Sequence, residues 1–96
     1  MIVSFADKMT EDLFHGRSST KVRKLPASIQ RAALIKLDIL NAASSVLDLK
    51  SPPGNRLENL EGKQKGCSSI GINDQWRLVF RFEDANAYDV QIMDYH

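Results

Sequence analysis

Apolar residues recur at steps of three and four positions in the middle of the chain, a spacing that places their side chains on one face of an α-helix. The stripe consists of Ile29, Ala33, Leu37, Leu40, Ala43 and Leu47. Pro26 precedes the stripe, and proline suits the start of a helix because the first amides of a helix make no hydrogen bond within it. The prolines and the glycine of segment 51–55 end the helical region, because they cannot continue a helix. The pattern predicts a long helix that packs on a sheet, although a helix that packs on a partner protein would show the same stripe.

Alternation with a period of two, which is typical of half-buried strands, dominates the C-terminal third. One side of the segment 76–82 is formed by Trp76, Leu78, Phe80 and Phe82, and the other by Arg77, Val79 and Arg81. After a turn at 83–86, the next strand is expected to have an apolar side formed by Tyr88, Val90 and Ile92. A further strand is predicted at 69–72, ahead of a turn at Asn73 and Asp74.

The N-terminal part predicts shorter elements. Residues 1–5 are apolar and partly β-branched, which favours a short strand. Residues 7–14 are expected to form one or two helical turns with Asp7 as the N-cap. Residues 17–20 are expected to form an exposed polar connection. Strands, helices and the absence of a repeat together predict one α+β domain over residues 1–96.

Length and composition are those of a globular protein with a single core. The chain has 96 residues, of which 43% are hydrophobic and 26% charged, so extended disorder is not expected. No apolar run is long enough to span a bilayer, and the first residues lack the pattern of a secretory signal. The single cysteine, Cys67, cannot form an internal disulfide, which suits a reducing cytoplasm.

The net charge of +1 is the sum of two segregated regions. Residues 13–37 contain no acid, and their bases are Arg17, Lys21, Arg23, Lys24, Arg31 and Lys36. Residues 82–96 contain no lysine or arginine, and their acids are Glu83, Asp84, Asp89 and Asp94. With this distribution of charge, a chain of low net charge can still have basic surfaces that bind phosphate. Solvated helix faces and turns would produce the same segregation.

The side of the predicted sheet opposite the core presents two arginines, Arg77 and Arg81. Three more basic residues belong to the preceding loop region, whose 62–66 segment is expected to be mobile: Arg56, Lys63 and Lys65. Because a guanidinium donates two parallel hydrogen bonds to phosphate, this combination predicts an anion-binding concavity. The alternative is that both arginines pair across strands with Glu83 or Asp89.

The sequence closes on Asp94, Tyr95 and His96, which suit proton transfer and RNA contact. Phosphodiester cleavage by a ribose 2′-hydroxyl needs a base, an acid and positive charge, but no metal. Terminal polar residues are also commonly frayed and without function. His15 and His96 are far apart and Cys67 stands alone, so we expect neither a metal site nor a cofactor. No phosphate-binding glycine loop indicates nucleotide hydrolysis.

Three segments carry a resemblance to a known family: SPPGNRLENL at 51–60, SIGINDQWR at 69–77 and DYH at 94–96. Over nearly its whole length the chain resembles HigB-type toxins of the RelE/ParE superfamily. The resemblance implies a RelE-like microbial RNase fold, with two helices packed on a small, mostly antiparallel sheet. It also implies a type II toxin that cuts mRNA in the ribosomal A site and so inhibits translation.

The partners implied by the resemblance are the ribosome with its mRNA and a cognate helix-turn-helix antitoxin. In this family the antitoxin neutralises the toxin and represses the shared operon, so the toxin meets operator DNA only indirectly. No membrane partner is implied. A ParE-like gyrase inhibitor, which cuts nothing, and a non-catalytic module that only docks its antitoxin are the alternatives within this fold.

Catalytic roles also follow from the resemblance. Arg77 would hold the scissile phosphate or the charge that develops on it, and Asp94, Tyr95 and His96 match the C-terminal residues needed for cleavage. His96 is the better candidate for proton transfer. Some relatives have histidine where Glu58 stands, so either Glu58 is the base or His96 works with less help. The RNA-binding positions implied are Arg56, Lys63, Lys65 and Arg81.

Overall fold

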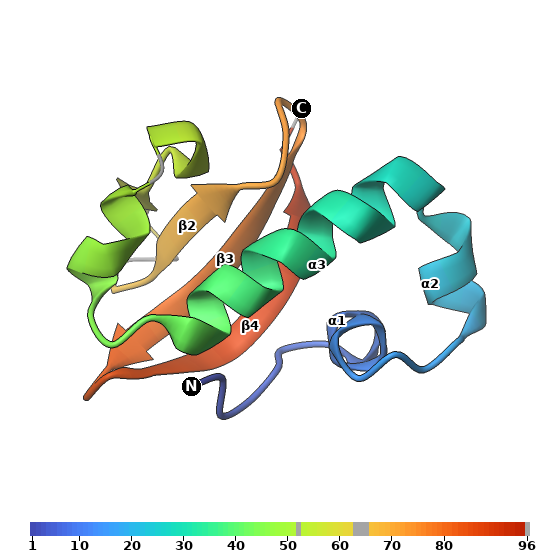
Figure 1. Ribbon diagram of the computed structural model, residues 1–96, viewed down its shortest axis with the longest axis horizontal. Coiled ribbons are helices and arrows are strands. Elements are labelled where there is room, and N and C mark those ends of the chain that lie inside the picture. Colours follow the sequence, from blue (N-terminus) through green and yellow to red (C-terminus); the bar gives the residue numbers. More distant parts are fainter. Residues whose placement is uncertain (52, 63–65, 96) are drawn as a thin grey trace.

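A four-stranded antiparallel sheet and three helices form an α+β arrangement in the computed structural model, which describes residues 1–51, 53–62 and 66–95 (Figure 1). The sheet follows chain order, with β1 (Glu58–Asn59), β2 (Ser68–Gly71), β3 (Trp76–Glu83) and β4 (Asn86–Asp94). The helices are α1 (Lys8–Phe14), α2 (Thr20–Lys24) and α3 (Ala27–Ala42), and α3 lies diagonally across the sheet. Two 3₁₀ turns, η1 (Val46–Lys50) and η2 (Pro53–Asn55), connect α3 to β1.

The N-terminal segment runs parallel to β4, along the edge that no other strand occupies. Isolated bridges join Ile2 to Ala87 and Phe5 to Val90, and the amide of Val3 donates to the carbonyl of Ala87 at 2.8 Å. The strand predicted at 1–5 is therefore present as extended chain with two bridges. Because this pairing is parallel, the arrangement is mostly antiparallel, as expected.

The first helix begins as predicted and the second was missed. The Asp7 carboxylate accepts a hydrogen bond from the amide of Thr10 at 2.9 Å, which caps α1. The polar connection predicted at 17–20 is present at 17–19, and α2 begins at its last residue, Thr20, where Ser19 caps the amide of Val22 at 3.2 Å. Five residues with one buried side chain leave no periodic pattern, so α2 had no hydrophobic signal.

The apolar stripe forms α3 as predicted, but the helix ends earlier than the stripe. Ile29, Ala33, Leu37 and Leu40 are buried, whereas Leu47 is 63% exposed and lies in η1. The cause is local, because the side chains of Ser45 and Asp48 form a capping box with the backbone that starts η1 in place of a continued α3. No helix among the described residues is long and apolar enough to cross a membrane.

A bulge in β4 reverses part of the predicted alternation. Val79 pairs with Gln91, but Arg81 pairs with Tyr88, so β4 contains one extra residue between these pairs. Asp89 absorbs it with a φ of 54°. Tyr88 was predicted on the apolar side; it lies instead beside Arg81, whose guanidinium carbon is 4.7 Å from the Tyr88 ring centroid. The pattern of polar and apolar residues does not reveal a bulge, so alternation alone predicted the wrong side of the sheet for Tyr88.

The core lies between α3 and the sheet. Leu37 and Leu40 of α3 and Leu78 and Phe80 of β3 have no exposed surface. Leu78 and Phe80 occupy alternate positions on β3, so Arg77 lies on the other face. The helix layer thus fixes which face of the sheet is left for the arginines.

Candidate functional site

Arg77 lies almost flat across the sheet instead of projecting into solvent. Only 7% of the residue is exposed. Its Nε donates to the Ser69 hydroxyl at 2.8 Å, and its Nη2 donates to the carbonyls of Ser69 and Arg56. Three acceptors from two segments therefore fix the plane of the guanidinium, which limits the freedom it would lose on binding a ligand.

Arg56 approaches the same place from the chain that precedes β1. Its backbone has a φ of 47°, a left-handed conformation that non-glycine residues adopt rarely. Its Nη2 donates to the carbonyl of Asn73 at 2.9 Å, and its Nη1 lies 3.5 Å from the carboxylate of Asp74. The turn at 72–75, predicted from Asn73 and Asp74, is thus the part that holds the Arg56 head group.

The two guanidiniums meet above a glycine. A methyl group on Gly71 would lie 3.3 Å from Nε and Nη2 of Arg56 and 3.4 Å from Nη1 of Arg77. Gly71 pairs with Arg77 in the sheet, so it lies beneath the side chain of its neighbour. A side chain at position 71 would occupy the place where the guanidiniums lie. We call Arg56 and Arg77 the arginine pair.

Among the described residues, the carboxylates that pair with the arginine pair are two at its margins. Glu58 lies 3.9 Å from Nη2 of Arg77, with its side chain 59% exposed, and Asp74 is fully exposed. Ion pairs this open to water contribute little. Two adjacent cations with weakly held counter-charges favour an anion, and a phosphate matches the fork of each guanidinium.

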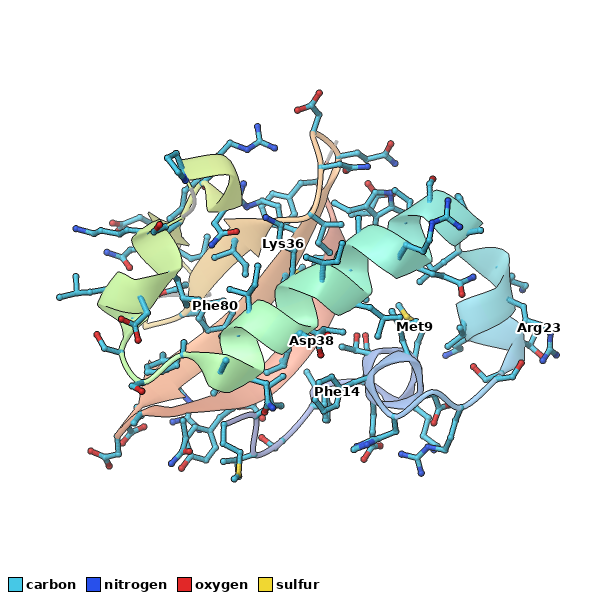
Figure 2. The ribbon with its side chains drawn as sticks, in the orientation of Figure 1. Met9, Phe14, Arg23, Lys36, Asp38 and Phe80 are labelled. Atoms are coloured by element: carbon cyan, nitrogen blue, oxygen red, sulfur yellow. The ribbon has the colours of Figure 1, made fainter. Side chains whose placement is uncertain are left out.

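Lys36 is a third cation at this edge of the sheet, and the sequence did not single it out as a site residue. It leaves α3 on the side of β2 and donates to Oδ1 of Asn55 at 2.6 Å (Figure 2). Burial lowers the pKa of Lys36, and the positive charge of Arg56 lowers it further. In the sequence Lys36 is only one of several lysines and arginines along a helix. The fold alone brings it next to Asn55.

The C-terminal residues lie at the same end of β3 as the arginine pair. Trp76 pairs with Asp94, the amide of Tyr95 donates to the carbonyl of Gln75 at 2.6 Å, and Nε2 of Gln75 donates to the Asp94 carboxylate at 3.2 Å. Arg77 pairs with Met93, so Tyr95 follows on the same face by alternation. His96 lies outside the described residues.

Arg81 belongs to a separate group. It lies on the Arg77 face but further along β3, where it forms ion pairs with Glu83 and, at 3.8 Å, with Asp89. The cross-strand pairing considered for both arginines is therefore confirmed for Arg81. For Arg77 it is wrong, because Arg77 turns toward β2 and β1. Lys63 and Lys65 lie outside the described residues, so their predicted RNA contact stays a prediction.

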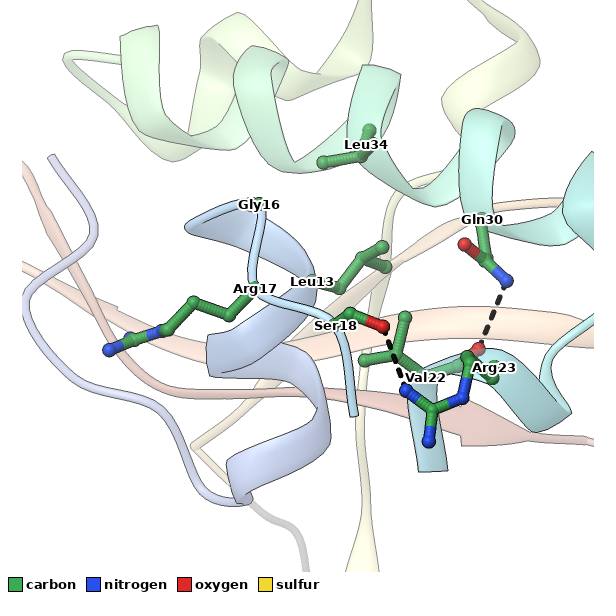
Figure 3. A pocket seen from close by; sticks show the side chains of 8 residues that line it. All are labelled: Leu13, Gly16, Arg17, Ser18, Val22, Arg23, Gln30 and Leu34. Atoms are coloured by element: carbon green, nitrogen blue, oxygen red, sulfur yellow. Dashed lines mark hydrogen bonds between the residues drawn. The ribbon is translucent and has the colours of Figure 1, made fainter. Parts of the chain in front are cut away.

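A hollow of about 250 Å³ lies between the helices and is formed by other residues (Figure 3). Leu13, Val22 and Leu34 are among its lining residues. The polar groups at its rim serve the fold, since Gln30 of α3 donates to the carbonyl of Val22 in α2, and Arg23 of α2 donates to Ser18 in the segment before it. Among the described residues, no group of histidine, cysteine and acidic side chains could hold a metal ion. The arginine pair is therefore the best candidate site.

Known proteins resemble this chain over most of its length. Residues 3–96 match the model of a family described as "RelE-like toxin of type II toxin-antitoxin system HigB". The chain is 41% identical over 92 residues to Toxin HigB-1 of Vibrio cholerae, covering 96% of this chain and 95% of that protein. It is 39% identical over 61 residues to an uncharacterized protein of Haemophilus influenzae, covering 64% of this chain and 60% of that protein.

Solved structures show the same fold at low sequence identity. YoeB in the YoeB–YefM complex of Staphylococcus aureus aligns with a TM-score of 0.63 and 14% identity, covering 100% of this chain and 98% of that one. YafQ of Escherichia coli aligns with a TM-score of 0.52 and 15% identity, covering 98% of this chain and 91% of that one. The RelE-like α+β fold expected from the sequence is confirmed, with α2 as an additional short helix.

Proposed function

The chain belongs to the HigB-like family of RelE-related toxins of type II toxin–antitoxin systems, and from this premise we propose that it is an endoribonuclease that cuts mRNA in the ribosomal A site. The observation that supports the proposal is the arginine pair. Arg56 and Arg77 lie together over Gly71, with one guanidinium held by three acceptors and carboxylates only at the margins. Such a pair suits the phosphate of an RNA backbone.

The proposed reaction needs no group that the chain lacks. The ribose 2′-oxygen attacks the adjacent phosphorus, the bond from phosphorus to the 5′-oxygen breaks, and a cyclic phosphate and a 5′-hydroxyl result. A base takes the 2′-hydroxyl proton and an acid returns a proton to the 5′-oxygen. The arginine pair would stabilise the negative charge that develops on the phosphate oxygens. We therefore propose a mechanism without metal or cofactor.

The proton-transfer groups are proposed at both sides of Arg77. The carboxylate of Glu58, 3.9 Å from Nη2 of Arg77, would lie beside a phosphate bound there and is a candidate base. Asp94 and Tyr95 follow on the β4 side of Arg77 and are proposed to act together with His96, with His96 in proton transfer and Tyr95 orienting the RNA. A Glu58→Gln variant separates the two candidate bases, because it keeps the size of the side chain and removes its basicity.

The ribosome is proposed to supply the substrate in a reactive conformation. Nonspecific attraction to RNA grows with the number of phosphates neutralised, and a chain with a net charge of +1 gains little from this effect. Holding mRNA in line for attack contributes much of the rate of such a reaction. Dependence on the ribosome is thus consistent with a toxin of low net charge.

The partner proposed for this toxin is a cognate helix-turn-helix antitoxin, through which alone it would meet operator DNA. YoeB of S. aureus, which shares the fold, is in complex with YefM. We propose that the toxin acts in the cytoplasm, where ribosomes and mRNA are, and that residues 1–96 fold as one domain. Arg81, Lys63 and Lys65 are proposed to contact RNA outside the arginine pair.

The decisive experiment is cleavage of mRNA on purified ribosomes. We expect the purified toxin to cut an mRNA within the A-site codon, as mapped by primer extension, and to leave the same mRNA intact when ribosomes are omitted. Brief induction in cells should give the same cuts in translated messages. Double-strand DNA breaks without mRNA cleavage would support a gyrase inhibitor and contradict the proposal, as would an inactive toxin in the ribosome assay.

Gly71→Ala is expected to lower the cleavage rate without lowering stability. The new methyl group would lie 3.3 Å from Nε and Nη2 of Arg56, so this guanidinium must shift by a few tenths of an ångström, and it would touch Nη1 of Arg77 at 3.4 Å. Since small misplacements of binding groups are costly in catalysis, we expect a loss of about three- to tenfold. Single-turnover cleavage on ribosomes measures the rate, and thermal unfolding measures the stability.

Gly54→Ala is the matched control. Apart from its two neighbours along the chain, no heavy atom of the described residues lies within 4 Å of the position that its methyl group would take. The control should cut at the wild-type rate. Equal rates for both alanine variants would show that the space above Gly71 does not matter for cleavage.

A further inference from the structure

We propose that Lys36 is a positioning residue for the arginine pair: its ammonium anchors Asn55, and Asn55 sets the place of Arg56. This inference rests on the proposed function, because it concerns the same phosphate-binding groups. Lys36 belongs to α3, on the core side of the sheet, whereas the arginine pair lies over the opposite face. The connection runs through η2, which contacts β2.

Asn55 is the centre of this connection. It has no exposed surface. Its Oδ1 accepts from Lys36 at 2.6 Å, and its Nδ2 donates to the carbonyls of Leu49 at 3.2 Å and Ser51 at 3.3 Å. One buried amide therefore joins α3 to the C-terminal end of η1 and to the residue that follows it. Removing the ammonium would leave Oδ1 without that donor in a buried place.

The next residue along the chain is Arg56, and both parts of Arg56 serve the site. Its carbonyl accepts from Nη2 of Arg77, and its own guanidinium is held by the carbonyl of Asn73. The φ of 47° at Arg56 is a costly conformation, which persists only when neighbouring contacts enforce it. Arg56 is held by its own amide, which donates to the carbonyl of Pro53 at 3.1 Å, and by the contacts of Asn55, which fix the residue just before it. A shift of Asn55 would thus displace Arg56 directly and Arg77 through its hydrogen bond.

The charge of Lys36 fits this role. A half-buried ammonium next to Arg56 is unfavourable in the absence of an anion, and its lowered pKa reflects both burial and the neighbouring guanidinium. A phosphate on the arginine pair would offset that repulsion. Lys36 would then contribute to the site through position and through charge, without contacting the phosphate itself.

The test compares substitutions of Lys36 in the ribosome cleavage assay. We expect Lys36→Met to slow single-turnover cleavage about tenfold, and Lys36→Arg, which keeps the charge and the donors, to recover most of the rate. Lys50→Met is the matched control, because Lys50 is an exposed lysine at the end of η1, in the same part of the fold as Asn55. The control removes the same charge and is expected to change the rate less than twofold.

A double-mutant cycle separates positioning from simple support of the fold. If Lys36 acts through Arg56, Lys36→Met should have a clearly smaller effect in an Arg56→Ala background than in the wild type, with some loss remaining because the alanine keeps the carbonyl that accepts from Arg77. The same tenfold loss in both backgrounds would overturn the inference, as would a Lys36→Met toxin that cuts at the rate of the Lys50→Met control. Should Lys36→Met fail to fold in a thermal unfolding assay, Lys36→Gln, which retains a donor, takes its place in the cycle.

The outcomes also distinguish this inference from the proposed function. A wild-type toxin that does not cut mRNA on ribosomes would overturn the proposed function and, with it, the role of Lys36. A wild-type toxin that cuts mRNA, together with additive effects of Lys36 and Arg56, would overturn the role of Lys36 alone.

Discussion

Arg77→Ala is expected to lower the rate of mRNA cleavage by about a hundredfold to a thousandfold, the range found when one preorganised donor to a developing negative charge is removed. Arg77 is the best-held cation of the site, since Ser69 and the carbonyl of Arg56 fix its orientation. Binding therefore costs it little side-chain freedom, and its loss cannot be replaced by a nearby flexible lysine. Single-turnover cleavage on ribosomes and growth after induction measure the effect.

Two further variants show whether the shape of the Arg77 guanidinium or its charge is responsible for its contribution to the cleavage rate. Arg77→Lys keeps the charge and loses the fork, so its rate should fall between those of the wild type and Arg77→Ala. Arg81→Ala should lose less than about tenfold, because Arg81 is 42% exposed and already paired with Glu83 and Asp89. A soluble, folded Arg77→Ala toxin that still arrests growth at the wild-type rate would contradict the assignment of the site.

Elements with a regular pattern could be predicted from the sequence because their signal is local. The stripe along α3 and the alternation along β3 each report the burial of one face, and both elements appeared where expected. The errors occurred where a single residue overrides the pattern. Ser45 starts a 3₁₀ turn and leaves Leu47 exposed, and the bulge at Asp89 moves Tyr88 to the other side of the sheet.

The candidate site was predictable residue by residue but not as an arrangement. Arg56, Glu58 and Arg77 were named from the sequence, and the structure brings these three together. The closeness of Arg56 and Arg77 depends on Gly71, which leaves room for two guanidiniums. The pattern of polar and apolar residues does not predict this role of Gly71. The contact of Lys36 with Asn55 joins residues 19 positions apart through the packing of α3. Such contacts follow from the fold, so periodicity cannot reveal them.

Phe80→Ala is expected to reduce the free energy of unfolding by about 3–5 kcal/mol, the usual cost of a large cavity in a core. Phe80 is fully buried and belongs to the cluster that Leu37 and Leu40 form with the sheet. A small domain is stable by only about 5–15 kcal/mol, so much of the variant should be unfolded in cells. Urea unfolding followed by circular dichroism measures the loss.

The comparison of Phe80 with Phe82 and Arg77 separates folding from chemistry on a single strand. Phe82 lies on the same side of β3 as Phe80 but is partly exposed, so Phe82→Ala should cost clearly less than Phe80→Ala. Equal losses for the two phenylalanines would contradict the placement of the core. Phe80→Ala should abolish toxicity by depleting folded toxin, and the folded fraction should cut mRNA at nearly the wild-type rate. Arg77→Ala should do the reverse, with normal amounts of folded toxin and little cleavage, because the two side chains lie on opposite faces of β3.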